Sequence, residues 1–208
     1  MTTNQYSYKE LSKNIFDCKV CPTPCDGVSK MNYNFISDVE FAEKNEAFIR
    51  NQINLNPDLH AEKCEKEGYP DIAIYNKASM NLIKYVEVKA QRRTFMSVER
   101  ILPKSNLKPS ETLALNLSDL LRYFDIKKKI NLPISIVWIV TGRPCVTGKK
   151  SYKYFYQSVD ELEHIYNKYE EKRKFRRKSG RGDIVDGFHK GVVVNYHFSI
   201  NELIEKNL

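Results

Sequence analysis

The sequence of 208 residues is poor in the glycine and proline that form long loops, and it has no apolar run long enough for a membrane span. It contains 8 Gly, 8 Pro and a single Trp, and we find no internal repeat or low-complexity tract. Its longest apolar run, PISIVWIV at 133–140, is far too short to cross a bilayer. The polar N-terminus lacks the basic and then apolar pattern of a signal peptide. We therefore expect a cytoplasmic protein with no membrane-spanning segment.

Acidic residues are outnumbered, and several enzymatic motifs are missing. The chain has 26 Asp and Glu against 34 Lys and Arg, which gives a net charge of +8. A basic protein attracts polyanions, so nucleic acid is the first candidate partner and an anionic membrane surface is the second. No helicase, ATPase or methyltransferase motif is present. These absences exclude the motor and modification enzymes that also act on nucleic acids.

Cysteine is scarce and odd in number. Five cysteines without a secretion signal make a disulfide framework a poor interpretation, and reduced thiols or metal ligands a better one. Three of them, Cys18, Cys21 and Cys25, form the pattern C-x2-C-x3-C within a proline-containing segment. This spacing is tight enough for the three thiols to hold one metal.

Three ligands need a fourth to close a metal site. Cys64 is our first candidate, and His60 and Cys145 follow it. A structural Zn²⁺ knuckle is preferred and a [4Fe–4S] cluster is the alternative, while three reduced thiols in a loop remain the simplest explanation. We therefore expect residues 1–36 to be a Cys-rich N-terminal extension, and residues 37–208 to form a single domain.

Helical and extended patterns alternate along that domain. Helices are expected over 37–54, 118–129 and 158–178, and extended segments over 59–64, 70–75, 82–90, 133–140 and 191–200. This order predicts the α/β class, with a mixed central β-sheet flanked by helices.

Two of the expected strands carry charge where an interior is predicted. Alternate residues of a strand share a face, so Glu87 and Lys89 point one way and Val86 and Val88 the other. Pairing with the preceding strand could bring Asp71 beside Glu87. Two buried carboxylates repel each other, and a divalent cation is the usual compensation. Oxygen atoms of Asp71, Glu87 and the Val88 backbone carbonyl would suit Mg²⁺, with Mn²⁺ as a substitute.

Lys89 and the first helix add to this candidate site. Lys89 could orient or deprotonate an attacking water and offset charge that develops on phosphorus, so the chemistry predicted is phosphodiester hydrolysis. Glu46 shares the apolar stripe of the first helix with Ile49 and Ile53, and a carboxylate on that stripe should face the sheet. Glu43, at the edge of the stripe, is the second choice.

These residues match a known motif. Pro70-Asp71, fifteen further residues and then Glu87-Val88-Lys89, after a helix that bears Glu46, resembles the PD-(D/E)XK nucleases, the restriction-endonuclease-like superfamily. The resemblance implies a restriction-endonuclease-like core in which Asp71 and Glu87 bind metal and Lys89 acts on the water. Glu46 would complete the metal environment. Gln91 extends the motif to E-V-K-A-Q, similar to branches that carry a catalytic Gln there. The Cys-rich extension is not part of the common core.

A simpler explanation exists for the same residues. Glu87 and Lys89 could be a solvent-facing pair on an edge strand, and Asp71 a turn residue after a proline. The adjacent Pro-Asp, the inward-facing Glu46, the valines on the opposite face and the basic composition favour the nuclease interpretation.

Two groups of basic residues are candidates for DNA contact. Arg92 and Arg93 lie just beyond the predicted catalytic strand, where they could position the phosphate. A denser group is expected at the end of a helix: Lys172, Arg173, Lys174, Arg176, Arg177, Lys178 and Arg181. Phosphate contact and a solvated helix end, where cations meet the helix dipole favourably, are equally good interpretations of this group.

The sequence thus predicts a Mg²⁺-dependent DNA endonuclease of a type II-like restriction or other genome-defence kind. A homodimer would suit two-fold symmetric DNA. A nuclease of repair or recombination that recognises DNA structure, a nuclease of RNA, and a nucleic-acid-binding module without catalysis are the alternatives.

Overall fold

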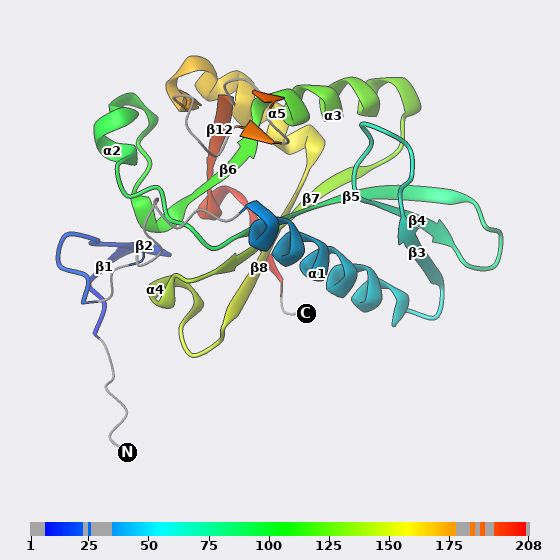
Figure 1. Ribbon diagram of the computed structural model, residues 1–208, viewed down its shortest axis with the longest axis horizontal. Coiled ribbons are helices and arrows are strands. Elements are labelled where there is room, and N and C mark those ends of the chain that lie inside the picture. The colour runs from blue at the N-terminus through cyan, green and yellow to red at the C-terminus, as the bar shows by residue number, and fades with distance from the viewer. Residues whose placement is uncertain are drawn as a thin grey trace.

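The computed structural model describes residues 7–22, 25, 35–177, 184–185, 188–189 and 194–206. Its largest element is a six-stranded mixed sheet with the order β13-β8-β7-β5-β4-β3 (Figure 1). The strands are β3 (Leu59–Lys63), β4 (Ile72–Asn76), β5 (Leu82–Gln91), β7 (Ile134–Thr141), β8 (Tyr152–Ser158) and β13 (Ile204–Lys206). Strands β5 and β7 are parallel, and every other neighbouring pair in this sheet is antiparallel.

Helices cover both faces of this sheet, as Figure 1 shows. Helix α1 (Phe35–Asn54) places Ile49 against Ile72, Val86 and Val88 on one face. Helices α3 (Leu117–Ile130) and α5 (Val159–Tyr169) pack on the other face, around a larger core that includes the fully buried Trp138. The predicted fold class, a mixed central sheet flanked by helices, is confirmed.

A second sheet of three antiparallel strands, in the order β6-β12-β9, was not predicted. Its strands are β6 (Thr112–Asn116), β12 (Val194–Ser199) and β9 (Lys174–Arg176). It joins the larger core through Phe198, whose ring centroid lies 5.8 Å from that of Trp138. Strand β6 precedes α3 directly, in a segment for which no strand was predicted.

The helix predicted over 158–178 is wrong in its second half. Helix α5 ends at Tyr169, and Glu170 then adopts a positive φ of 41°. A short 3-10 helix, Glu170–Arg173, and strand β9 follow. The chain leaves the helix because Phe175 packs on Phe95, 5.2 Å between ring centroids, while β9 pairs with β12.

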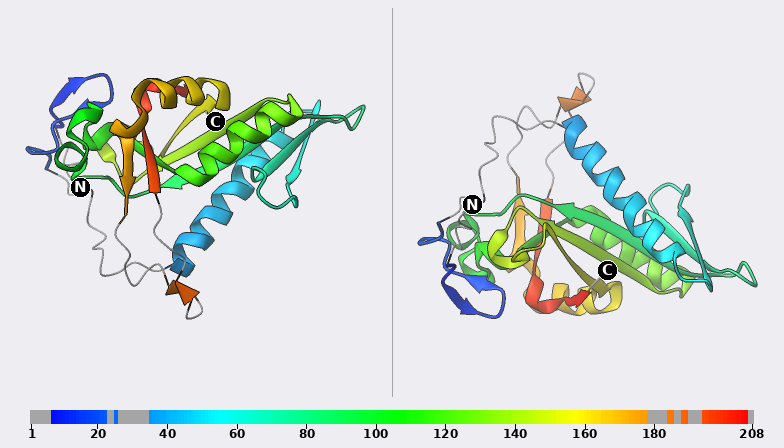
Figure 2. Two further views of the ribbon diagram at one scale, coloured as in Figure 1. Left: turned by 90° about the horizontal axis from the view of Figure 1, so that it is seen from above. Right: turned by 90° about the horizontal axis from the view of Figure 1, so that it is seen from below.

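The remaining elements are short. They are β1 (Glu10–Ser12), β2 (Ile15–Phe16), α2 (Val98–Ile101), α4 (Pro144–Thr147), β10 (Ile184–Val185) and β11 (Phe188–His189), with 3-10 helices at Pro103–Ser105, Pro109–Glu111 and Ile200–Glu202. The β1–β2 hairpin lies beside α2 and α4, at the end of the molecule far from the β4–β5 turn (Figure 2). Among the helices described, none combines the length and apolar character needed to cross a membrane.

Candidate active site

Asp71 and Glu87 meet at the start of β4. The register pairs Ile72 with Val86, which brings Asp71 next to Glu87 across the two strands. The backbone N–H of Asp71 donates to Glu87 Oε2 at 3.3 Å, and the N–H of Val88 donates to Asp71 Oδ2 at 2.8 Å. The two carboxyl groups also contact each other directly. Such a contact requires a proton or a cation between the groups, because two bare carboxylates repel.

Burial makes this pairing costly for two negative charges. Glu87 is only 2% exposed. Burial raises the pKa of Asp71 and of Glu87 above their usual values, and the hydrogen bond from Val88 and the charge of Lys89 offset only part of the effect. A site that holds two such carboxylates has a strong preference for positive charge.

Lys89 supplies the nearest positive charge. Its Nζ forms an ion pair with Glu87 Oε1 and lies 4.0 Å from Asp119 Oδ2. Burial alone would lower the pKa of Lys89, but the carboxylates of Glu87, Asp71 and Asp119 together outweigh it and the pKa lies above its usual value. Lys89 is therefore an ammonium group at neutral pH. With 31% of its side chain exposed, it can still reach a substrate.

Glu46 approaches the same site from α1. Its side chain forms an ion pair with Arg50, 3.8 Å between charged atoms, and is 17% exposed. Burial raises its pKa, and the negative charge of Glu87 contributes in the same direction. Asp71 is also within electrostatic reach of Glu46. The structure thus brings Glu46 near the carboxylate pair, whereas Glu43 is exposed.

Helix α3 contributes side chains for which no role was predicted. Tyr123, 2% exposed, donates its hydroxyl hydrogen bond to Glu87. Asp119 accepts a 2.7 Å hydrogen bond from Arg122 and faces Lys89 from the other side. Asp119 and Tyr123 are four residues apart, so they share one face of α3. That spacing, on a helix expected to cover the sheet, was the available signal.

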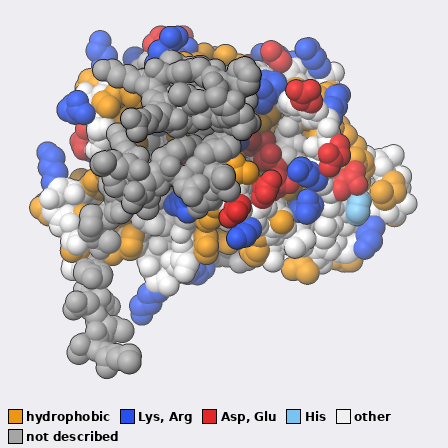
Figure 3. Space-filling view, in the orientation of Figure 1, with side chains coloured by type: hydrophobic (Ala, Val, Ile, Leu, Met, Phe, Trp, Pro, Cys, Tyr) orange, Lys and Arg blue, Asp and Glu red, His pale blue; other side chains and the backbone are white. Residues whose placement is uncertain are grey.

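The oxygen-rich composition of the site fits a hard divalent cation. Asp71 and Glu87 offer carboxylate oxygens, Val88 a carbonyl, and Glu46 a further carboxylate nearby. Across the described ranges, however, no three Asp, Glu, His or Cys side chains already stand in ligating positions around one point. Figure 3 shows acidic and basic side chains interspersed on the face where α1 approaches the β3–β5 meander. Cation binding would replace the direct contact between the two carboxyl groups.

Gln91 points away from this group. Its amide nitrogen donates to the carbonyl oxygens of Arg93 at 3.1 Å and Thr112 at 3.4 Å, and its oxygen accepts from the N–H of Ala114 at 3.0 Å. Both ends of the side chain are therefore occupied by backbone partners. Through the bonds to Thr112 and Ala114, Gln91 joins β5 to β6.

Arg92 and Arg93 both reach the first turn of α1. Arg92 forms an ion pair with one oxygen of Asp38, and Arg93 Nη2 lies 3.2 Å from the other oxygen. The guanidinium of Arg92 also stacks on Phe41, 4.7 Å from the ring centroid. A phosphate that bound here would compete with Asp38 for the two arginines.

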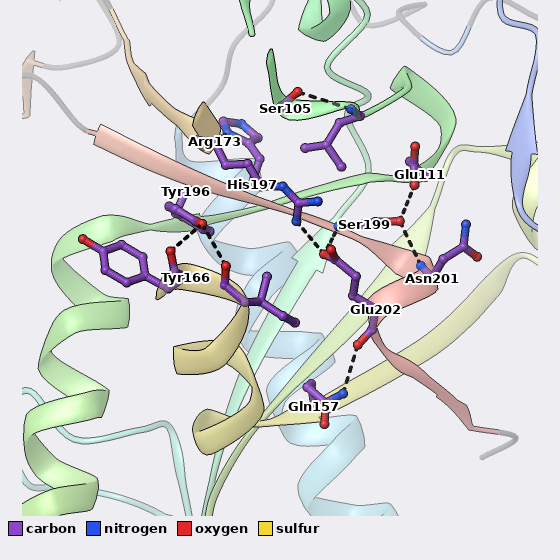
Figure 4. A network of polar contacts seen from close by, with 12 residues as sticks. Ser105, Glu111, Gln157, Tyr166, Arg173, Tyr196, His197, Ser199, Asn201 and Glu202 are labelled. Carbon is purple, nitrogen blue, oxygen red and sulfur yellow. Dashed lines mark hydrogen bonds and ion pairs between the residues drawn. The ribbon is translucent and has the colours of Figure 1, made fainter. Parts of the chain in front are cut away.

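The second basic group divides into buried and exposed members. Arg173 is 3% exposed, pairs with Glu202 at 2.6 Å and lies 3.5 Å over the ring of Tyr169, so it does not reach a DNA phosphate in this fold (Figure 4). Lys174 pairs with Glu171. Lys172 and Arg176 are exposed, and Arg177 is half-buried. Lys178 and Arg181 lie outside the described residues.

The cysteines group differently from the prediction. Cys145, in α4, hydrogen-bonds Cys25 and lies within electrostatic reach of Cys18 and Cys21. Cys64 follows β3 instead, where its N–H donates to the carbonyl of Asp71 at 2.8 Å. Of the candidates for a fourth ligand, Cys145 is therefore the one that lies beside Cys25, because α4 folds back toward the N-terminal hairpin, and Cys64 lies instead at the pairing of β3 with β4.

No protein-family model matches the sequence, and no curated protein matches it. Hjc, a Holliday junction resolvase from Archaeoglobus fulgidus, is similar in structure, with 9% identity and a TM-score of 0.40. The match covers 79% of this chain and 91% of Hjc. D212, a nuclease from a fusselovirus, is also similar in structure, with 11% identity and a TM-score of 0.44. The match covers 84% of this chain and 90% of D212. Both likenesses concern the course of the backbone alone.

Proposed function

We propose that this protein is a Mg²⁺-dependent DNA endonuclease that hydrolyses phosphodiester bonds. The observation that supports this most is the contact between the half-buried carboxyl group of Asp71 and the buried one of Glu87, with Lys89 ion-paired to Glu87. Such an arrangement is unfavourable in a purely structural role, because burial and like charge both oppose it. A catalytic cation would relieve the repulsion between the two carboxylates, and this relief would contribute to the affinity of the site for the cation.

Each residue has a distinct task in the proposed reaction. Asp71 and Glu87 would hold the cation, with the Val88 carbonyl and Glu46 as further oxygen donors. Bound Mg²⁺ would act as a Lewis acid on the phosphate. Lys89, as an ammonium group, would orient the attacking water and offset the charge that develops on phosphorus.

The surroundings of these residues support their positions. Tyr123 holds Glu87 by a hydrogen bond, and Asp119 lies 4.0 Å from the Lys89 ammonium group. Arg92 and Arg93 would exchange Asp38 for a DNA phosphate. Exposed Lys172 and Arg176 would add contacts to the DNA backbone, which contribute affinity but no sequence specificity.

A genome-defence role of the type II restriction kind is the specific form we propose, acting as a homodimer on two-fold symmetric DNA. The same chemistry would serve a nuclease that recognises a junction, a flap or RNA. Substrates distinguish these forms. Cleavage of duplex DNA into discrete fragments supports the restriction form, whereas cleavage of only a branched DNA or RNA supports the structural alternative.

The decisive experiment compares Lys89→Ala with Lys77→Ala. Lys77 is an exposed lysine in the β4–β5 turn and serves as the matched control. We expect Lys89→Ala to lower the cleavage rate by about 100-fold or more, because it removes the charge beside the phosphate. DNA binding should persist in both variants. Wild-type protein that leaves duplex, branched and single-stranded DNA and RNA intact with Mg²⁺ or Mn²⁺ would refute the proposal.

A further inference from the structure

A buried arginine lies close to three of the cysteines near the N-terminal hairpin and α4. Arg143, the residue before α4, is completely buried at 0% exposure. Its Nη1 donates to the carbonyl oxygen of Ser110 at 3.1 Å and its Nη2 to that of Arg93 at 3.0 Å. Its Nε has no hydrogen-bond partner in the described part of the chain. The guanidinium is thus fully buried with one N–H unsatisfied.

No carboxylate of the described residues forms an ion pair with Arg143. The groups within its electrostatic reach are the thiols of Cys25, Cys145 and Cys18. A buried guanidinium without a counter-charge costs several kcal/mol, and neutral thiols do not compensate it. The site therefore lacks negative charge, and its cysteines are the side chains that could provide it.

The thiols are already gathered. Cys25 and Cys145 are in hydrogen-bond contact, and Cys18 lies within electrostatic reach of Cys21, Cys25 and Cys145. Within the described residues the four sulfurs do not yet form a closed ligand set.

We propose that Cys18, Cys21, Cys25 and Cys145 form a four-thiolate site for one metal centre, and that Arg143 is its buried counter-ion. Thiolates are the ligands of Zn²⁺ and of iron–sulfur clusters. Four thiolates around a Zn²⁺ ion, or around a [4Fe–4S] cluster of charge +2, leave a net charge of about −2, part of which the guanidinium offsets. On binding, each thiol releases its proton to solvent, so no oxidant or reductant is needed.

The site would brace the end of β5. Arg143 bonds to the Arg93 carbonyl, and Ser110, its other partner, accepts from the N–H of Phe16 at 2.9 Å through its hydroxyl. Next to Arg143, Gly142 has a φ of 69°, and a Cβ there would lie 2.8 Å from the Arg92 carbonyl oxygen. The metal centre would thus fasten the N-terminal segment to the backbone of Arg92 and Arg93. This site does not depend on the nuclease proposal.

Metal analysis of protein purified without oxygen tests the proposal. We expect about one equivalent of zinc, or about four of iron with the visible absorption of a cluster, in wild type and in Cys64→Ser. Cys64→Ser is the matched control, because Cys64 lies at β3. Cys145→Ser should lose most of the metal. Wild type with neither metal, or loss of metal in Cys64→Ser but not in Cys145→Ser, would overturn the assignment.

A second measurement avoids variants that fail to fold. Native wild-type protein is treated with a maleimide before and after a strong chelator, and the labelled cysteines are identified by mass spectrometry. The proposed four should be protected until chelation, whereas the labelling of Cys64 should not change with the chelator. Equal labelling of the four with and without chelator would contradict the site.

Discussion

The N–H of Val88 donates a 2.8 Å hydrogen bond to Oδ2 of Asp71 and so fixes that carboxyl group beside Glu87. The bond joins adjacent strands, so the position of Asp71 depends on the pairing of β4 with β5 and not on its own rotamer alone. The candidate active site is therefore part of the sheet itself.

Asp71→Asn should stabilise the metal-free protein. The amide oxygen can keep the bond from Val88, while one half-buried negative charge next to Glu87 disappears. We expect a gain of about 1 kcal/mol, which for a protein of this size raises Tm by about 2–4 °C. Differential scanning fluorimetry without metal measures this. Added Mg²⁺ should raise the Tm of wild type but not of the variant. The exposed Asp58→Asn is the control, and a lower Tm in Asp71→Asn would contradict the predicted repulsion.

Tyr123→Phe should slow cleavage while leaving the core filled. It removes only the hydrogen bond to Glu87, a loss of about 1 kcal/mol, or roughly fivefold in rate if the carboxylate shifts. Tyr196→Phe is the matched control, because its hydroxyl bonds backbone carbonyls of α5 away from the site. Both variants should lose similar stability in urea. Equal cleavage rates in the two variants would mean that Tyr123 does not position Glu87.

The buried His197 should make stability fall with acid. Burial lowers its pKa from 6.5 to about 4, and its Nδ1–H donates to the Arg173 carbonyl at 3.1 Å. Between these two pKa values the unfolded chain takes up a proton that the folded chain does not. The free energy of unfolding should therefore decrease as pH falls from about 6.5 to about 4, by about 3 kcal/mol in total.

Urea unfolding of wild type and His197→Asn across this pH range isolates that contribution. Asn can still donate to the Arg173 carbonyl but does not titrate. The difference in unfolding free energy between the two proteins should shrink by about 3 kcal/mol from pH 7 to pH 4. A difference that is independent of pH would show that His197 keeps its usual pKa in the fold.

Arg173 and Lys172 should separate stability from DNA binding. Arg173→Met leaves Glu202 without its buried partner and should cost about 3–5 kcal/mol. Lys172→Met should leave stability unchanged and reduce by about 1 the slope of log affinity against log salt. Chemical denaturation and salt-dependent DNA binding measure the two effects. A reduced salt slope in folded Arg173→Met with unchanged stability would reverse these assignments.

The sequence determined the strands and the faces of the candidate site. Residues alternate between the two faces of a strand whatever packs on them, so Glu87 and Lys89 had to share one face and Val88 the other. The apolar period of α1 likewise predicted that Glu46 faces inward. These features depend on local periodicity, and they could be predicted.

Tertiary structure alone decided which distant segments complete each site. Tyr123 and Asp119 reach Glu87 and Lys89 because α3 packs on β5, and Arg173 is buried because the chain turns into β9 to pair with β12. Cys145 joins Cys25 across 120 positions of sequence, while Cys64, nearer in sequence, lies elsewhere. Periodicity specifies the face of a residue, but contacts between elements depend on the packing of the whole core, which no local pattern encodes.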